Sequence, residues 1–140
     1  MKKIRVLWTL VGLFVVLMIV QANIRTFRIY LPVSKNILSI DIKKEGHSHT
    51  INDSKRIDEI VEWSKYIKPT KGFKINEEVK LDRAHDVVEI HIHSKTSKLD
   101  QVWLYIYKKG KRMYVEQPYN GVYRLNKTQY ERLNELIKEA

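Results

Sequence analysis

A chain of 140 residues with 44% hydrophobic and 30% charged residues has the composition of an ordinary globular protein with room for one core. It contains no cysteine, which excludes disulfides, thiolate metal sites, a cysteine nucleophile and a lipid-modified cysteine anchor. Its 26 basic and 16 acidic side chains give a formal charge of +10, which attracts polyanions without selecting one of them.

The N-terminus has the pattern of a targeting segment. Lys2, Lys3 and Arg5 precede residues 6–20, an apolar run in which only Thr9 is polar. A signal-peptide core takes about 7 to 15 apolar residues, whereas a membrane span takes about 20. The length of the run therefore favours a signal peptide over an anchor by a small margin.

Three interpretations of this segment stay open: a cleaved signal peptide, an uncleaved membrane anchor and a helix buried in a soluble core. Val20 and Ala22 supply the small residues that cleavage before Asn23 requires. In the first two cases the positive-inside rule keeps the basic N-terminus in the cytoplasm and places the body outside. We expect an exported protein, either anchored in the cell membrane facing outside or secreted. Its divisions are a signal or anchor over 1–22, a juxtamembrane segment over 23–36 and a domain over 37–140.

The first half of the body predicts a hairpin followed by a helix. Apolar and polar residues alternate over 37–43, and a turn at Glu45-Gly46 leads to a second strand over 47–51. Asn52 or Asp53 can cap a helix over 54–67 that has one apolar face. A further short candidate strand lies before the hairpin, at 27–31.

The second half predicts a meander of strands and a C-terminal helix. Residues 68–86 show neither periodicity and form a long connection. Asn126 and Gln129 have the spacing of a capping box that opens a helix running to residue 139. The expected strands lie at 87–94, 101–108, 112–117 and 122–125.

These elements predict an α+β fold. We expect an antiparallel sheet of about five strands with two helices, over 54–67 and 126–139, packed on one face. The signal or anchor helix precedes this domain.

The face of the sheet away from the helices has an unusual composition. Alternation along the central strands points eight polar and aromatic side chains away from the aliphatic core. Rings that carry hydroxyl or imidazole groups suit the binding of sugars, peptides or a partner sheet. Cross-strand pairing that only stabilises the sheet is the alternative. The candidate ligand-binding residues are Glu89, His91, His93, Trp103, Tyr105, Tyr107, Tyr114 and Glu116.

Two pairs of histidines raise a metal-binding hypothesis. His91 and His93 share one face of their strand, and His47 and His49 repeat the spacing in the hairpin. If the two strands were neighbours, the four imidazoles could bind zinc or copper, as in a metal or envelope-stress sensor. The simpler interpretation is that the histidines are solvated, so no metal or cofactor is assigned.

Catalysis has weaker support. Glu89 and Glu116 are the one carboxylate pair that alternation places on a common face, as a hydrolase acting on the cell wall would need. The five glycines are not spaced as a phosphate-binding loop. We therefore expect a protein that is not an enzyme.

The stretch 114–125, which contains the run Glu116-Gln117-Pro118-Tyr119-Asn120-Gly121, resembles DUF5301, a family of small exported Gram-positive bacterial domains of unknown function. The resemblance extends over most of 37–139, through the hairpin, its following helix and the strand at 103–107. It implies one extracytoplasmic domain behind a signal sequence and brings no activity with it. The physical interpretation of the run is a turn, in which Asn120-Gly121 accepts positive φ.

Together these observations predict a binding or interaction module at the cell envelope. We expect the membrane to be contacted through the N-terminal segment, and the partner to be an envelope protein or an anionic wall polymer. Nucleic acid is not expected outside the cell. The sequence does not define a ligand or an oligomeric state.

Overall fold

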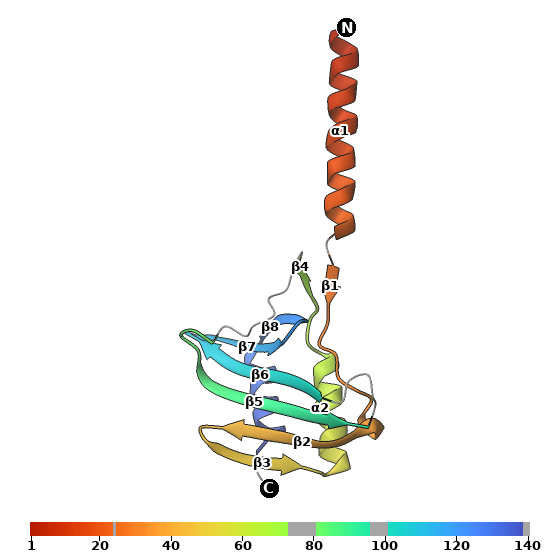
Figure 1. The fold of residues 1–140 in the computed structure, drawn as a ribbon. Coiled ribbons are helices and arrows are strands. Elements are labelled where there is room, and N and C mark those ends of the chain that lie inside the picture. The colour runs from red at the N-terminus through yellow and green to blue at the C-terminus, as the bar shows by residue number, and fades with distance from the viewer. Residues whose placement is uncertain (24, 73–80, 96–100, 139–140) are drawn as a thin grey trace.

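The protein is an α+β domain that follows a long N-terminal helix (Figure 1). The computed structural model describes residues 1–23, 25–72, 81–95 and 101–138. Parts of the predicted 68–86 connection and of the turn at 95–100, and the end of the C-terminal helix, lie outside these ranges. The elements in chain order are α1 (Lys2–Asn23), β1 (Arg25–Phe27), η1 (Ser34–Asn36), β2 (Ile37–Lys44), β3 (His47–Ile51), α2 (Ser54–Lys65), β4 (Thr70–Gly72), β5 (His85–Ser94), β6 (Gln101–Lys109), β7 (Arg112–Gln117), β8 (Gly121–Leu125) and α3 (Lys127–Leu136).

The main sheet has six antiparallel strands in the order β3-β2-β5-β6-β7-β8. The predicted meander from β5 to β8 is confirmed, and the predicted β2–β3 hairpin joins it by pairing β2 with β5. Strands β1 and β4 form a separate two-stranded sheet, which the sequence did not predict. Because β1 ends at Phe27, the candidate strand at 27–31 is wrong over residues 28–31.

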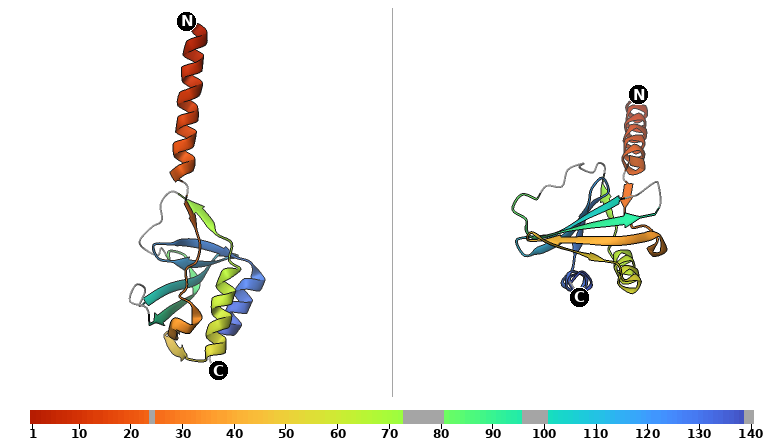
Figure 2. Two further views of the ribbon diagram at one scale, coloured as in Figure 1. Left: turned by 90° about the vertical axis from the view of Figure 1, so that its right-hand side faces the viewer. Right: turned by 60° about the horizontal axis from the view of Figure 1, so that its bottom comes forward.

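Both helices of the domain pack on the same face of the main sheet (Figure 2). The Asp53 side chain caps α2 by accepting hydrogen bonds from two backbone N–H groups, and Asn126 and Gln129 form the predicted capping box of α3. Trp63, which lies outside the predicted apolar face of α2, is also buried and donates its indole N–H to the Gln129 carbonyl at 2.9 Å. The two helices are therefore tied to each other as well as to the sheet.

The core lies between the helices and the sheet. Ile40, Ile92 and Val102 occupy one row across β2, β5 and β6, because the register pairs Ile40 with Ile92 and Ile92 with Val102. Residues Ile90, Leu104, Ile106 and Val115 on the same face are fully buried. The period-two alternation therefore predicted the core side of the central strands correctly.

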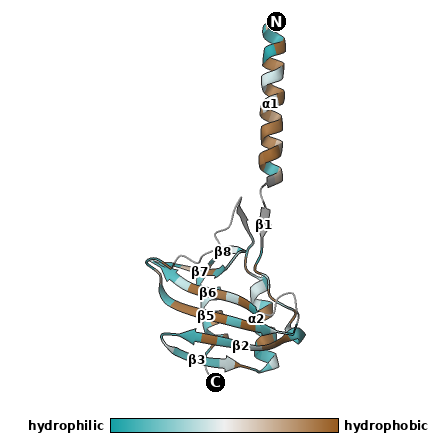
Figure 3. Cartoon of the chain, viewed as in Figure 1, coloured by the Kyte–Doolittle hydropathy of each residue, from teal (hydrophilic) through white to brown (hydrophobic). Residues whose placement is uncertain are grey.

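Helix α1 stands clear of the domain, and its residues are exposed along its length (Figures 1 and 3). Among the described residues it is the one helix long and apolar enough to cross a membrane, with a mean hydropathy of 2.2 over its most apolar 18 residues within Lys2–Ala22. Its 22 residues span about 33 Å at about 1.5 Å each, close to the thickness of a bilayer's hydrocarbon core. This exposure contradicts the buried-helix interpretation and is consistent with a signal peptide or an anchor.

The segment between β1 and β2 belongs to the domain rather than only linking it to α1. Ile29 and Leu31 pack against the hydrophobic core, and Pro32 is buried. The alternating side chain, Tyr30, points outwards and is 55% exposed. Part of the stretch predicted as juxtamembrane is thus a structural part of the fold.

Candidate functional site

The strand register places the eight predicted binding residues on the face opposite the helices, which we call the open face. Asp41 of β2 pairs with His91 of β5, and His91 pairs with Trp103 of β6. One row further along the sheet, Glu89 pairs with Tyr105, which in turn pairs with Glu116 of β7. Tyr107 and Tyr114 face each other in the next row, and His93 lies at the other end of β5.

Burial divides the open face into two parts. Tyr107 is 2% exposed and Glu116 is 6% exposed, and the Tyr107 hydroxyl donates a 2.8 Å hydrogen bond to the Glu116 carboxylate. Burial raises the pKa of Tyr107, and this hydrogen bond raises it further. These two residues form an internal pair and offer little surface to a ligand, so they are removed from the candidate binding set.

The accessible part of the open face centres on Trp103, which is 38% exposed. Its ring stacks on His91 with centroids 3.8 Å apart and planes 13° from parallel, and the centroid of the Tyr105 ring lies 6.5 Å from that of Trp103. Burial lowers the pKa of His91, and its neighbour His93 lowers it further. The stack holds Trp103 in one orientation before any ligand arrives.

A cavity of about 420 Å³ lies beside Trp103, within the size range of ligand pockets. Tyr30 and Tyr119 stand at it with 55% and 73% of their surface exposed, so three aromatic rings border one hollow. The lining is mostly apolar. We call this cavity the Trp103 pocket; its lining residues are Tyr30, Gln101, Val102, Trp103, Gln117, Pro118, Tyr119 and Asn120.

One side of the Trp103 pocket is held by hydrogen bonds between distant parts of the chain. The Gln117 side chain accepts from the Tyr30 N–H at 2.8 Å and donates to the Tyr30 carbonyl at 2.7 Å. Asn120 donates both to the Arg28 carbonyl and to the Gln117 amide oxygen. Because these two amides satisfy the backbone of residues 28–30, they shape the pocket and leave little hydrogen-bonding capacity for a ligand.

The turn that carries Tyr119 has a strained backbone. Tyr119 adopts a φ of +64° and Gly121 one of +141°, whereas the sequence had predicted positive φ at Asn120 and Gly121. The left-handed region costs a residue with a Cβ roughly 1 to 2 kcal/mol, and such strain concentrates at functional sites. In this turn the strained backbone places the exposed Tyr119 ring at the rim of the Trp103 pocket.

The four predicted metal-binding histidines do not converge. His49 pairs with Ile42 and therefore lies on the helix side of β3, where it donates a 2.7 Å hydrogen bond to the Ile137 carbonyl. His47 lies on that side too, whereas His91 and His93 are on the open face. Strand β2 also separates β3 from β5, so a four-histidine site is wrong.

Glu89 and Glu116 flank Tyr105 on neighbouring strands, as alternation predicted. Glu116 is engaged by Tyr107, and the Glu89 carboxylate lies 3.8 Å from the Lys43 amine. Burial raises the pKa of the Tyr105 hydroxyl between them, and the two carboxylates add to the effect. Each carboxylate is thus paired with a neighbouring side chain, within a row of polar residues that crosses the three strands.

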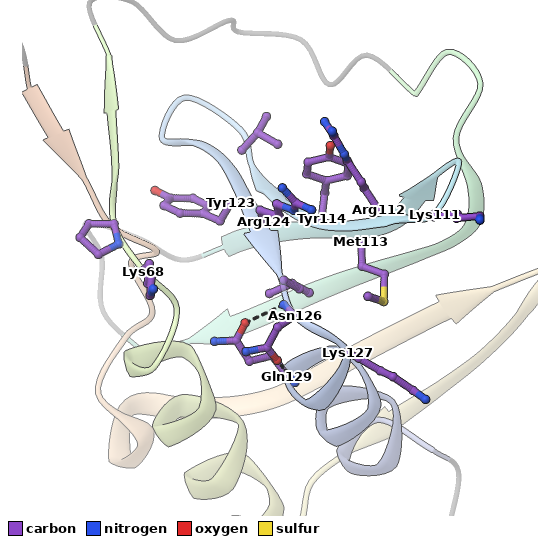
Figure 4. Close-up of a pocket in the computed structure, with 13 residues that line it drawn as sticks. Lys68, Lys111, Arg112, Met113, Tyr114, Tyr123, Arg124, Asn126, Lys127 and Gln129 are labelled. Carbon is purple, nitrogen blue, oxygen red and sulfur yellow. Dashed lines mark hydrogen bonds between the residues drawn. The ribbon is translucent and has the colours of Figure 1, made fainter.

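A second cavity, of about 670 Å³, lies along β8, the edge strand of the sheet (Figure 4). Basic side chains come to it from five places: the segment after α2, the β6–β7 turn, β7, β8 and the start of α3. Among the described residues that line it, none is acidic. We call it the basic pocket; its cations are Lys68, Lys111, Arg112, Arg124 and Lys127.

Comparison with protein families settles the membership of the chain. The family model DUF5301, whose description is "Domain of unknown function (DUF5300)", matches residues 26–124, well over half of the chain. The chain belongs to this family. The DUF5301 match starts in β1 and ends in β8, so it contains every residue of the Trp103 pocket but not α3.

No curated protein and no solved structure matches this DUF5301 domain. Any function of the domain must therefore be inferred from the geometry of the site itself. Sequence reasoning identified Trp103 but missed Tyr30, Gln101 and Gln117, because they come from separate elements that only the folded chain brings together. The one available signal was the 116–121 run, which supplies four of the pocket residues.

Proposed function

We propose that this DUF5301 domain is a non-enzymatic binding module that stands on the outer side of the cell membrane and holds a partner protein of the cell envelope. The observation that carries the proposal is the Trp103 pocket, in which three accessible aromatic rings border one apolar hollow. Binding hot spots in proteins are rich in tryptophan and tyrosine that fill or line such pockets. The site would therefore accept an aromatic or aliphatic side chain of the partner.

A protein partner fits the pocket better than a sugar does. Recognition of a sugar needs several polar groups directed at its hydroxyls, but the Gln117 and Asn120 amides are already bonded to the chain's own backbone. An apolar side chain needs no such groups and gains from leaving water, by about 25 cal/mol per Å² buried. The apolar lining supports this choice.

The outward orientation rests on α1. Lys2, Lys3 and Arg5 precede its apolar stretch, and the positive-inside rule keeps such a cluster in the cytoplasm. The domain then follows on the outer side, and if the helix stays uncleaved it tethers the pocket near the membrane surface.

A photo-crosslinking experiment tests the proposed role. A photoreactive amino acid replaces Tyr119, at the rim of the Trp103 pocket, in the full chain produced in its native cells. We expect one predominant crosslinked envelope protein, because a pocket of this size selects one contacting segment. The same residue in place of Tyr66 is the control, since Tyr66 is equally exposed, at 74% against 73%, but does not line the pocket.

Two results would count against the role. Identical crosslinks from positions 119 and 66 would show general proximity instead of recognition. Crosslinks from position 119 to wall polymer alone would show that the partner is a polymer and not a protein.

The basic pocket supports a second candidate function, the holding of an acidic envelope polymer or anionic lipid. Five cations line a single cavity that contains the N-terminal end of α3, where helix N–H groups favour an anion. The excess charge of the chain brings polyanions towards it.

The second candidate predicts salt-sensitive binding of inorganic polyphosphate, a probe for such polymers. Binding of the full chain should weaken steeply as salt screens the exposed charges. The variant Lys111→Gln/Arg112→Gln/Arg124→Gln should bind polyphosphate about 100-fold less tightly. Each cation near an anionic surface contributes about 1 kcal/mol of binding free energy, and the variant lacks three of them. The variant Lys35→Gln/Lys55→Gln/Lys95→Gln removes the same charge elsewhere and is the control. Equal losses in both variants, measured by titration calorimetry, would show that net charge acts without a site.

A further inference from the structure

A cluster of metal-ligand side chains lies next to the Trp103 pocket, and it differs from the set that the sequence suggested. We propose that Asp41, His91 and His93 form a binding site for Zn²⁺ on the open face of the sheet. The proposal does not depend on the partner protein or on either pocket. It rests on how β2 and β5 place three side chains of two strands together.

The register explains why the three side chains meet. Asp41 pairs directly with His91, and His93 stands two residues further along β5 on the same face. One ligand atom from each side chain lies within 4.8 Å of those of the other two. His93 Nε2 is 2.7 Å from Asp41 Oδ2, and the two imidazole centroids are 4.2 Å apart. The three residues lie where β2 and β5 are paired residue by residue, from Ser39 and His93 onwards.

The neighbours of the cluster hold its members in place. The Thr50 hydroxyl donates a 2.7 Å hydrogen bond to Oδ1 of Asp41, which leaves Oδ2 turned towards the histidines. Trp103 stacks on His91 and fixes its ring. Outer contacts of this kind orient the ligands of protein metal sites and set their affinity.

One atom of the cluster lacks a partner. Nε2 of His91 is buried, and within the described part of the chain it makes no hydrogen bond. Buried polar atoms are nearly always paired, so an unpaired one needs an explanation. A metal ion bound by this cluster supplies that explanation, because it gives the His91 ring a bond that the protein alone does not provide.

The donor set matches the chemistry of zinc. Two imidazole nitrogens and one carboxylate oxygen are three protein ligands of the types that Zn²⁺ prefers, and they leave a fourth position open for water or a ligand group. Donors about 2.1 Å from one tetrahedral ion stand about 3.4 Å apart, so small side-chain rotations complete the geometry. The ion takes the place of the proton between His93 Nε2 and Asp41 Oδ2. A neutral His93 then carries its single proton on Nδ1, whereas a protonated His93 also releases one proton to solvent.

Titration of the full, untagged chain with ZnCl₂ in a mild detergent tests the site. Titration calorimetry should show one ion bound per chain, and Co²⁺ used in its place should give the visible absorption of a low-symmetry site. His91→Gln, His93→Gln and Asp41→Asn should each weaken Zn²⁺ binding by more than about tenfold, and Thr50→Val by about tenfold, the lower end for an outer contact.

His47→Gln is the matched control, because His47 is an exposed histidine on the other side of the same sheet and its loss should leave binding unchanged. Circular dichroism of every variant checks folding, and His93→Gln with Asp41→Asn decide the matter if His91→Gln unfolds through loss of its stack on Trp103. No binding by the wild type, or wild-type affinity in the His93 and Asp41 variants, would overturn the proposal and leave the cluster a hydrogen-bonded pair beside a stacked ring.

Discussion

Replacing Gln117 with alanine should lower the free energy of unfolding by about 1 to 3 kcal/mol, the cost of leaving partly buried partners without their hydrogen bonds. Gln117 is 7% exposed and makes two hydrogen bonds to the backbone of Tyr30. Without its amide, the segment around Tyr30 loses its attachment to the end of β7, and one side of the Trp103 pocket opens. Urea denaturation of the full chain in a mild detergent, followed by near-ultraviolet circular dichroism, measures the loss.

Two variants sharpen this test. Gln117→Glu keeps the acceptor for the Tyr30 N–H but turns a carboxylate oxygen towards the Tyr30 carbonyl, so it should destabilise the domain at least as much as alanine does. Gln101→Ala removes an exposed glutamine of the same pocket and should change stability by less than about 0.5 kcal/mol. Trypsin should also cleave after the exposed Arg28 faster in Gln117→Ala. If Gln117→Ala and Gln101→Ala behaved alike, the amide would not hold the segment.

The local elements of the fold could be predicted because their signals lie within short stretches of sequence. Alternation located the central strands and their core side, and the spacing of Asn126 and Gln129 located the start of α3. Trp63 escaped because its burial depends on a second helix packing beside α2, which periodicity in one helix cannot show.

The candidate site could be predicted only in part, because its geometry is set by contacts between distant segments. Trp103 was found from alternation alone. The pairing of Tyr30 with Gln117, which are 87 positions apart, needed the folded chain. Alternation also could not show that Tyr107 and Glu116 are buried on the face away from the helices, since it assigns a side and not an exposure.

The histidine pairs show the same limit. Spacing placed His91 and His93 together correctly, but which face of β3 carries His47 and His49 depends on the register with β2. That register puts Asp41 beside His91, where the second histidine pair was expected. The candidate metal ligands are therefore two histidines and one aspartate, and not four histidines. Strand order and register are properties of the whole sheet, so they cannot be predicted from the residue pattern of a single strand.

Trp103→Ala carries the second large expected effect, on binding. Trp103 is the ring common to the stack with His91 and to the pocket, and truncation of such a central aromatic costs at least about 2 kcal/mol of binding free energy. That corresponds to an affinity about 30-fold lower. The domain itself should stay folded, because 38% of the side chain is already exposed and the core face is untouched.

The measurement that tests the central claim most directly is capture from solubilised cell envelope by the wild-type chain, Trp103→Ala and Tyr66→Ala in parallel. Each chain is first checked by circular dichroism, and the captured protein is identified by mass spectrometry. We expect the wild type and Tyr66→Ala to retain the same protein, and Trp103→Ala to lose it. Equal capture of that protein by all three chains would contradict the assignment of the Trp103 pocket as the recognition site.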